Sequence, residues 1–228
     1  MLKRFIMAIV VAFNSIKGGV GKTTLAAQFT AYLSKFSKVG VLNSDSENAL
    51  EMWISRRGDK DLALIENIEL LPVDFDFDKQ GKHYDYIICD LAGGDNKISR
   101  QVLAKNANIV ISPFKPSQFD IDTVVKHNTL LSHIKKEFNP TLKSFYWFNL
   151  CNTNLKSKAF TESSQIFSDL IKQKIIDSTL IKSPLFAREI LSTSAADGLS
   201  CFDLGYKAKK SAAEIEPVIK KILKLKDK

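Results

Sequence analysis

The sequence predicts a single α/β domain with a doubly wound, mainly parallel β-sheet and helices on both faces. Three observations lead to this fold class. Short apolar runs rich in β-branched residues recur along the chain, segments with helical spacing separate them, and polar residues follow most runs. Strands that alternate with helices are typical of parallel sheets. Right-handed crossovers bring the carboxyl ends of such strands to one edge, where ligands bind.

The composition agrees with one globular domain over residues 1–228. Hydrophobic residues make up 45% and charged residues 25%, which are ordinary values and exclude fibrous and disordered classes. The three cysteines, Cys89, Cys151 and Cys201, are far apart and form no C-x-x-C motif, so we expect neither a disulfide framework nor a zinc site, and a reducing cytoplasmic setting. No histidine has ligand-like spacing, and His127 and His133 are expected at the surface or the edge of the core.

Six apolar runs are predicted as strands. Two basic residues precede the first run, as in a secretory signal, but a Gly-rich segment follows it in place of a cleavage site. We therefore expect a buried strand there. No run approaches the roughly 20 residues that span a bilayer. The runs cover residues 5–13, 39–42, 68–73, 84–89, 109–112 and 145–148.

Two segments between these runs carry apolar residues at helical spacing, which predicts amphipathic helices. The first face comprises Leu25, Phe29, Tyr32, Leu33 and Phe36. The second comprises Ile121, Val124, Val125, Leu130, Leu131 and Ile134.

A phosphate-binding loop is predicted where the first strand meets the first helix. Residues 17–24 read KGGVGKTT, although the strict G-x-x-x-x-G-K-[ST] pattern requires glycine where this chain has Ile16. Glycines let successive N–H groups face inward, and the helix N-terminus adds its own donors for phosphates. Lys22 would reach the β- and γ-phosphates, Thr23 would bind Mg²⁺, and Thr24 is placed for the α-phosphate. The predicted nucleotide-binding residues here are Gly18, Gly19, Val20, Gly21, Lys22, Thr23 and Thr24.

The KGGVGKTT segment resembles the deviant Walker A box of the ParA/MinD ATPases. The resemblance covers almost the whole chain, is strongest over residues 5–120, and the chain's length is most similar to the short ParF-type partition ATPases. It implies that Lys17 crosses a dimer interface to the partner's nucleotide. A second cation at the γ-phosphate would stabilise both an ATP sandwich and phosphoryl transfer, as an arginine finger does. The alternative for Lys17 is a solvated loop lysine.

Two carboxylates are predicted to act at this site. The family places D-x-D-P-Q after its second strand, where residues 43–47 read NSDSE. The resemblance implies that Asp45 orients the attacking water, and Asp45 could also serve as a helix N-cap. Asn43 replaces the first aspartate, and it can accept a hydrogen bond from a metal-bound water without supplying charge. Glu47 replaces the glutamine.

Residues 84–94 read YDYIICDLAGG, an apolar strand that ends in an aspartate. After a P-loop this pattern is typical of a Walker B strand, so Asp90 is expected to hold Mg²⁺ through water. Gly93 and Gly94 permit a loop that moves with the γ-phosphate. Cys89 is expected as a buried strand residue.

The base-binding residues follow later strands. Residues 113–120 resemble the family's P-x-x-P-S-x-x-D loop, which adds Pro113 and Ser117 to the predicted binding residues. Asn149 ends the next strand, where relatives contact adenine. The guanine-reading N-K-x-D motif is absent because residues 96–99 read NKIS, so ATP is favoured over GTP.

The net charge of +8 lies mostly at the C-terminus. Residues 207–228 hold eight lysines and three acidic residues, and apolar residues at helical spacing predict a basic amphipathic helix over about 207–226. It could be a docked helix with a solvated face, a nonspecific DNA contact as in ParA-like proteins, or a membrane-targeting helix as in MinD. The lack of Trp and Phe and of a long linker argues against the membrane. Candidate DNA contacts are Arg188, Lys207, Lys209, Lys210, Lys220, Lys221 and Lys224.

The leading hypothesis is a slow ATP hydrolase of the partition type. ATP and Mg²⁺ would close a homodimer that binds DNA nonspecifically, and a ParB-like centromere-binding adaptor would stimulate hydrolysis, which drives DNA segregation on the nucleoid. A MinD-like membrane-associated spatial regulator is the main alternative. A metabolic enzyme on the same fold, such as an amide-forming ATPase or an iron–sulfur reductase, is a third.

Overall fold

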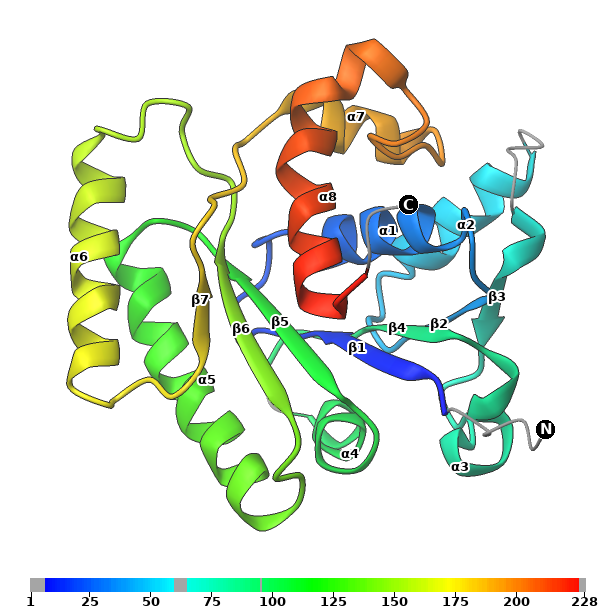
Figure 1. Cartoon of the computed structure of the whole chain (residues 1–228), viewed down its shortest axis with the longest axis horizontal. Coiled ribbons are helices and arrows are strands. Elements are labelled where there is room, and N and C mark those ends of the chain that lie inside the picture. The colour runs from blue at the N-terminus through cyan, green and yellow to red at the C-terminus, as the bar shows by residue number, and fades with distance from the viewer. Residues whose placement is uncertain (1–6, 60–64, 95, 226–228) are drawn as a thin grey trace.

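The computed structural model describes residues 7–59, 65–94 and 96–225. It contains a seven-stranded sheet in which every neighbouring pair is parallel, in the order β3-β2-β4-β1-β5-β6-β7 (Figure 1). The predicted fold class is confirmed. The strands are β1 (Ile9–Phe13), β2 (Val39–Asn43), β3 (Ile68–Leu71), β4 (Tyr86–Asp90), β5 (Ile109–Phe114), β6 (Lys143–Phe148) and β7 (Thr179–Ile181).

The six predicted runs correspond to β1–β6, whereas β7 was not predicted. β7 is a three-residue edge strand with no fully buried side chain, so it lacks the apolar run that marks the others. The first predicted run begins at residue 5, and its first two residues lie outside the described ones.

Helices cover both faces of the sheet (Figure 1). Successive strand residues point to opposite sides, so Val11 and Phe13 of β1 pack with α1, α2, α7 and α8, and Val10 and Ala12 pack with α4, α5 and α6. The helices are α1 (Lys22–Leu33), α2 (Ala49–Asp59), α3 (Phe77–Gln80), α4 (Lys97–Lys105), α5 (Gln118–Glu137), α6 (Lys158–Lys172), α7 (Glu189–Ala196) and α8 (Lys209–Leu223).

Two helical predictions require correction. α1 ends at Leu33, so Phe36 lies beyond the helix and is 43% exposed. His127 was expected at the surface or the edge of the core, but it is 2% exposed within α5. Helical spacing places a residue on a face without telling how far another element covers that face, and here β6 and the end of β1 cover it.

The predicted basic helix corresponds to α8, which packs against α1 through its apolar face. Ile215, Val218, Ile219 and Ile222 are buried in the same core as α1, and Leu225 packs against it. The last predicted residue, Lys226, lies outside the described residues. Within the described parts of the chain, no helix combines the length and apolar character needed to cross a bilayer.

Candidate nucleotide-binding site

The predicted phosphate loop lies at the carboxyl edge of the sheet, between β1 and α1. Gly21 occupies the N-cap position of α1 with φ 93°, in the left-handed region that favours glycine. A Cβ atom there would also lie 2.3 Å from Nδ2 of Asn149. That same Nδ2 donates a hydrogen bond of 2.7 Å to the carbonyl of Val20. Asn149 therefore holds the loop in place, a role that sequence reasoning missed.

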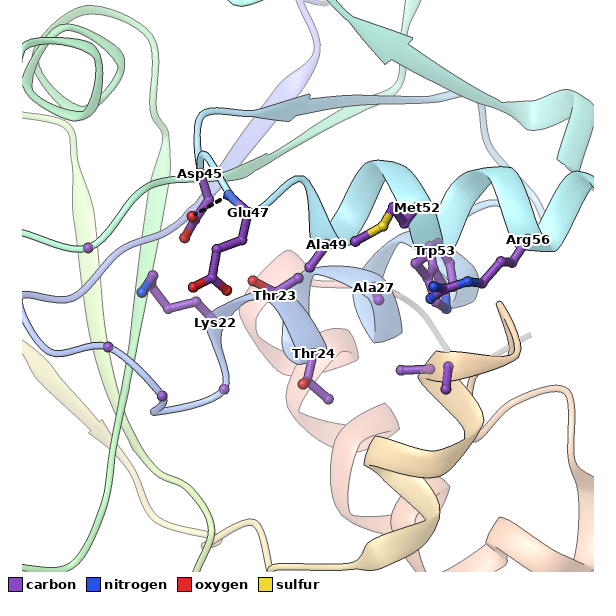
Figure 2. Close-up of a pocket in the computed structure, with 16 residues that line it drawn as sticks. Lys22, Thr23, Thr24, Ala27, Asp45, Glu47, Ala49, Met52, Trp53 and Arg56 are labelled. Atoms are coloured by element: carbon purple, nitrogen blue, oxygen red, sulfur yellow. Dashed lines mark hydrogen bonds between the residues drawn. The ribbon is translucent and has the colours of Figure 1, made fainter.

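Two cavities meet at this loop. The first has a volume of about 420 Å³ and includes Lys22, Thr23 and Gly93 in its wall, as Figure 2 shows for its labelled residues. The second, of about 280 Å³, is lined by Asn149, Leu25 and the segment 187–189, among others. Gly21 and Thr24 belong to both walls. We call the cavities the first lobe and the second lobe of one cleft.

Asp90 ends β4 directly behind the first lobe. It is fully buried, and no described residue donates a hydrogen bond of standard geometry to either carboxylate oxygen. Burial raises the pKa of Asp90 to about 6, and the nearby Asp45 adds to the rise, while the Thr23 hydroxyl and the Lys22 ammonium oppose it. An unpaired buried carboxylate beside a threonine hydroxyl is well suited to a hydrated Mg²⁺ ion.

Asn43 lies beside Asp90, since the two residues are register partners at the ends of β2 and β4. Its amide is used within the protein. Oδ1 accepts from the N–H of Asp45 at 3.1 Å, and Nδ2 donates to the carbonyl of Asp45 at 3.1 Å and to Oε1 of Glu51 at 3.3 Å. Asn43 thus fixes the loop after β2 to α2, and its predicted contact with a metal-bound water would compete with these bonds.

Asp45 lines the first lobe, and its role in orienting water stays a prediction. Its Oδ1 accepts from the N–H of Glu47 at 3.2 Å, which closes a turn within the loop (Figure 2). α2 begins at Ala49, so Asp45 is not its N-cap.

The loop after β4 is joined to the loop after β2 and to the phosphate loop. The N–H of Ser44 donates to the carbonyl of Asp90 at 2.9 Å, and the N–H of Ala92 donates to Oγ of Ser44 at 3.1 Å. Gly94, with φ 85°, donates to the carbonyl of Ser15. A Cβ atom on Gly93 would lie 3.6 Å from Nζ of Lys22. Gly93 therefore lies close to the ammonium group of Lys22, and Gly94 joins the loop after β4 to the segment that follows β1.

Lys17 is paired within its own chain. Its Nζ lies 2.5 Å from Oδ2 of Asp120, a carboxylate that also accepts from the Ser117 hydroxyl and the Lys115 N–H. Burial acts to raise the pKa of Asp120, but these donors together lower it below the ordinary value. Lys17 keeps 38% of its side chain exposed, so it is neither buried nor a free loop lysine.

Pro113 and Ser117 lie on this side of the phosphate loop, away from the cleft. Pro113 lines a small cavity with Lys17 and Asp120, and Ser117 is the N-cap of α5, where its side chain accepts from the N–H of Asp120. Neither residue belongs to the walls of the two lobes. Their predicted contact with a nucleotide stays a prediction, and the structure gives Ser117 a role in positioning Asp120.

Replacing Lys17 with alanine is expected to destabilise the protein by about 1 kcal/mol near neutral pH, because the half-exposed lysine is only partly desolvated. A carboxyl with a lowered pKa contributes stability above its unfolded pKa of about 4 and loses it as the pH falls through its folded pKa. The difference in the free energy of unfolding between wild type and Lys17→Ala should therefore shrink as the pH falls from 6 to 3.5. Denaturant unfolding at several pH values measures it.

The matched control for this prediction is Lys115→Ala. Lys115 bonds Asp120 through its backbone N–H, which alanine keeps, so stability should change little at any pH. A loss of stability in Lys17→Ala that is the same at every pH would contradict the pairing with Asp120.

His127 forms part of a buried polar chain behind the phosphate loop. Nε2 lies 2.8 Å from Oδ1 of Asn14, and Nδ1 lies 3.0 Å from the hydroxyl of Tyr146. Because Asn14 Oδ1 only accepts, Nε2 carries the proton, and Nδ1 competes with the carbonyl of Val124, 3.3 Å from the Tyr146 oxygen, for the single hydroxyl proton of Tyr146. Burial lowers the pKa of His127 to about 4, and Lys22 adds to this, so the ring is neutral at physiological pH.

The structure divides the candidate DNA contacts into two groups. Arg188 is paired with Glu214, and Lys220 lies 2.9 Å from Glu216, so their charges are compensated. The other group is exposed at the surface and comprises Lys207, Lys209, Lys210, Lys221 and Lys224. The first three border an open cavity of about 710 Å³ beside Tyr206, whose side chain is 89% exposed.

Sequence reasoning missed the wall of the second lobe that follows β7. Leu185, Ala187 and Ser192 line it, and the bond from the N–H of Leu185 to the carbonyl of Phe148 attaches this segment to the end of β6. Because β7 was not predicted, nothing in the sequence placed the residues after it at the carboxyl edge of the sheet.

Comparisons with known proteins agree with this geometry. The chain is 23% identical over 220 residues to maintenance of carboxysome distribution protein A of Halothiobacillus neapolitanus, covering 95% of this chain and 97% of that protein. A variant of Cyanothece McdA in complex with ATP superimposes with a TM-score of 0.79 at 16% identity, over 97% of this chain and 98% of the other. A plasmid partition protein of Borrelia burgdorferi B31 bound to AMPPNP superimposes with a TM-score of 0.68 at 19% sequence identity. The superposition covers 94% of this chain and 99% of the other.

The parallel sheet, the KGGVGKTT loop at the start of α1 and Asp90 at the end of β4 define a P-loop protein of the ParA/MinD type. The profile of the VirC1 protein family matches residues 7–215. The chain belongs to that family.

Proposed function

We propose that the protein is an ATP-hydrolysing positioning ATPase that uses ATP and Mg²⁺ to control a homodimer. The observation that supports this best is the two-lobed cleft around Gly21 and Thr24, with Lys22 in the wall of one lobe and the unpaired carboxylate of Asp90 behind it. The phosphates would occupy the first lobe and the base the second, with the N-terminus of α1 between them.

Thr23 and Asp90 fit a magnesium site. The threonine hydroxyl would bind the ion directly and Asp90 would accept from its water ligands, which would give its carboxylate oxygens the partners they lack. Bound Mg²⁺ would neutralise charge on the phosphates during their transfer. Lys22 would contact the same phosphates, and Asp45 would hold a water against the γ-phosphate.

Lys17 would act in the partner subunit's site once ATP is bound. To do so it must leave Asp120, which keeps its bonds from Ser117 and Lys115 when the lysine departs. The ion pair is therefore expected in the nucleotide-free monomer, and a contact with the γ-phosphate would replace it in the dimer.

We further propose that the exposed lysines beside Tyr206 and at the end of α8 contact DNA phosphates without reading sequence. Relatives are described as a carboxysome distribution protein and a plasmid partition protein, which supports a cargo-positioning role on the nucleoid. A ParB-like adaptor would connect the ATPase to its DNA cargo and stimulate hydrolysis in the cytoplasm.

The test is DNA binding with ATP, with ADP and without nucleotide, for wild type and Lys22→Ala. Removing the phosphate-binding cation should weaken ATP binding about 10- to 100-fold, as expected for a charge-assisted hydrogen bond. The variant should then lose ATP-dependent retention on DNA, which in wild type should fall steeply with salt. Fluorescence anisotropy of a labelled duplex and of an ATP analogue measures both.

Lys143→Ala is the control, because this exposed lysine lies at the start of β6, at the opposite edge of the sheet. It removes the same charge and should leave both measurements unchanged. If DNA binding is the same with ATP, with ADP and without nucleotide, and is unchanged in Lys22→Ala, the switch mechanism is wrong. ATP-dependent pelleting with anionic liposomes, without DNA retention, would instead support membrane association.

A further inference from the structure

We propose that Glu47 takes over the charge that Asn43 does not supply and accepts from a magnesium-bound water in the first lobe. This inference rests on the proposed nucleotide-binding function and adds a residue to its metal site. It starts from two departures from the family pattern, an amide in place of the first aspartate and a carboxylate in place of the glutamine.

Position 43 favours a neutral side chain in this protein. An aspartate there would place a second carboxylate beside the buried, unpaired Asp90, its register partner. It would also face Glu51, to which the Asn43 amide now donates at 3.3 Å. Two buried carboxylates side by side repel, and a third at the start of α2 increases the cost. An amide removes the repulsion and converts the contact with Glu51 into a hydrogen bond.

Glu47 places a carboxylate on the open side of the same site. It lines the first lobe with Lys22, Thr23 and Asp45, and Figure 2 shows its carboxylate turned toward Thr23, above the Lys22 side chain. Its backbone is held by the bond from its N–H to Asp45, whereas its carboxylate has no hydrogen bond to another described residue. The fixed backbone and the free carboxylate leave the side chain available to a ligand in the lobe.

The second observation that points to a cation is Asp90 itself, which is fully buried, unpartnered and next to the Thr23 hydroxyl. Within the described residues, no three His, Cys, Asp or Glu side chains form a group that could hold a metal directly. Mg²⁺ retains several of its waters in nucleotide sites. Asp90, buried behind the first lobe, and Glu47, exposed in its wall, would each accept a hydrogen bond from a water bound to the same Mg²⁺ ion.

The test measures magnesium affinity without hydrolysis. Titration of the full chain and a fluorescent ADP with MgCl₂ gives the Mg²⁺ concentration for half-maximal tightening of ADP binding. Glu47→Gln should raise that concentration about 10-fold, in line with the loss of one outer ligand of a metal. ADP binding in EDTA should stay unchanged, and folding should too, because the replaced carboxylate is exposed and bonded to no described residue.

Two variants make the result specific. Glu51→Gln removes a charge one turn further along the chain but keeps the oxygen that accepts from Asn43, so it should leave the magnesium response unchanged. Asp90→Asn should abolish that response.

A wild-type magnesium response in Glu47→Gln, together with a lost response in Asp90→Asn, would overturn the role of Glu47 and leave the proposed function standing. An equal loss of magnesium affinity in Glu47→Gln and Glu51→Gln would also overturn the role of Glu47. Such a loss would reflect the negative charge around α2 in general and not a contact made by Glu47. If wild type binds neither ADP nor MgADP, the proposed function itself fails.

Discussion

Asp90→Asn is expected to stabilise the metal-free protein at pH 8 and to remove its response to magnesium. The pKa of the buried carboxyl is raised to about 6, so the folded protein holds this proton more tightly than the unfolded chain does. The stability gained from that proton is present below the unfolded pKa of about 4, declines as the pH rises, and is gone above about 6. Above pH 6 the buried charge costs on the order of 2–3 kcal/mol.

Asparagine removes this charge but brings an amide that also needs partners, so the net gain should be about 1–2 kcal/mol at pH 8. At pH 4 the gain should vanish because the wild-type carboxyl is protonated in the folded state. Urea unfolding in EDTA at both pH values measures the difference. Addition of Mg²⁺ to the ADP-bound proteins should make wild type the more stable of the two, since the further stabilisation by magnesium would act on wild type alone. A variant less stable than wild type in EDTA at pH 8 would contradict the unpaired state of Asp90.

Arg57→Met is expected to destabilise the protein by about 3–5 kcal/mol, the cost of leaving one member of a buried ion pair without its partner. Arg57 is 1% exposed, and its guanidinium donates to the two oxygens of Asp203 at 2.7 and 2.9 Å and to the carbonyl of Gly198 at 3.1 Å. Burial acts to raise the pKa of Asp203, but Arg57 and Ser200 lower it overall. Methionine would leave that carboxylate with the donors of Ser200 alone among the described residues.

This pair attaches α2 to the segment between α7 and α8, and residues of α2 and α7 both line the first lobe. Thermal unfolding should therefore shift down by about 10 °C or more, and nucleotide binding should weaken with it. Arg56→Met is the matched control, because Arg56 is the exposed neighbour on the same helix, and its effect on stability should stay within about 0.5 kcal/mol. Similar unfolding temperatures for the two variants would show that the pair contributes little.

Sequence reasoning located the strands that are buried on both faces, because such strands need continuous apolar runs. It also placed Gly21, Lys22 and Asp90 at one edge, since a parallel sheet brings the ends of its strands together. The three-residue edge strand β7 carries no such run, and with it the wall of the second lobe was missed.

Ion pairs between residues far apart in the sequence could not be predicted either. Lys17 and Asp120 are separated by 103 positions and Arg57 and Asp203 by 146, so their contacts depend on the packing of whole elements. The departure at Asn43 was visible in the sequence, but its reason was not. That reason lies in Glu51, eight positions on, which only the folded loop brings to the amide.

The strand order also determines when the site forms during synthesis. β1, which leads into the phosphate loop, lies in the middle of the sheet and pairs with β4 and β5. Both neighbours are encoded well downstream, so an emerging chain exposes β1 while about a hundred further residues are translated. At typical elongation rates this takes about 5–20 s. For that interval an apolar segment with unpaired backbone groups is open to chaperones and to other nascent chains.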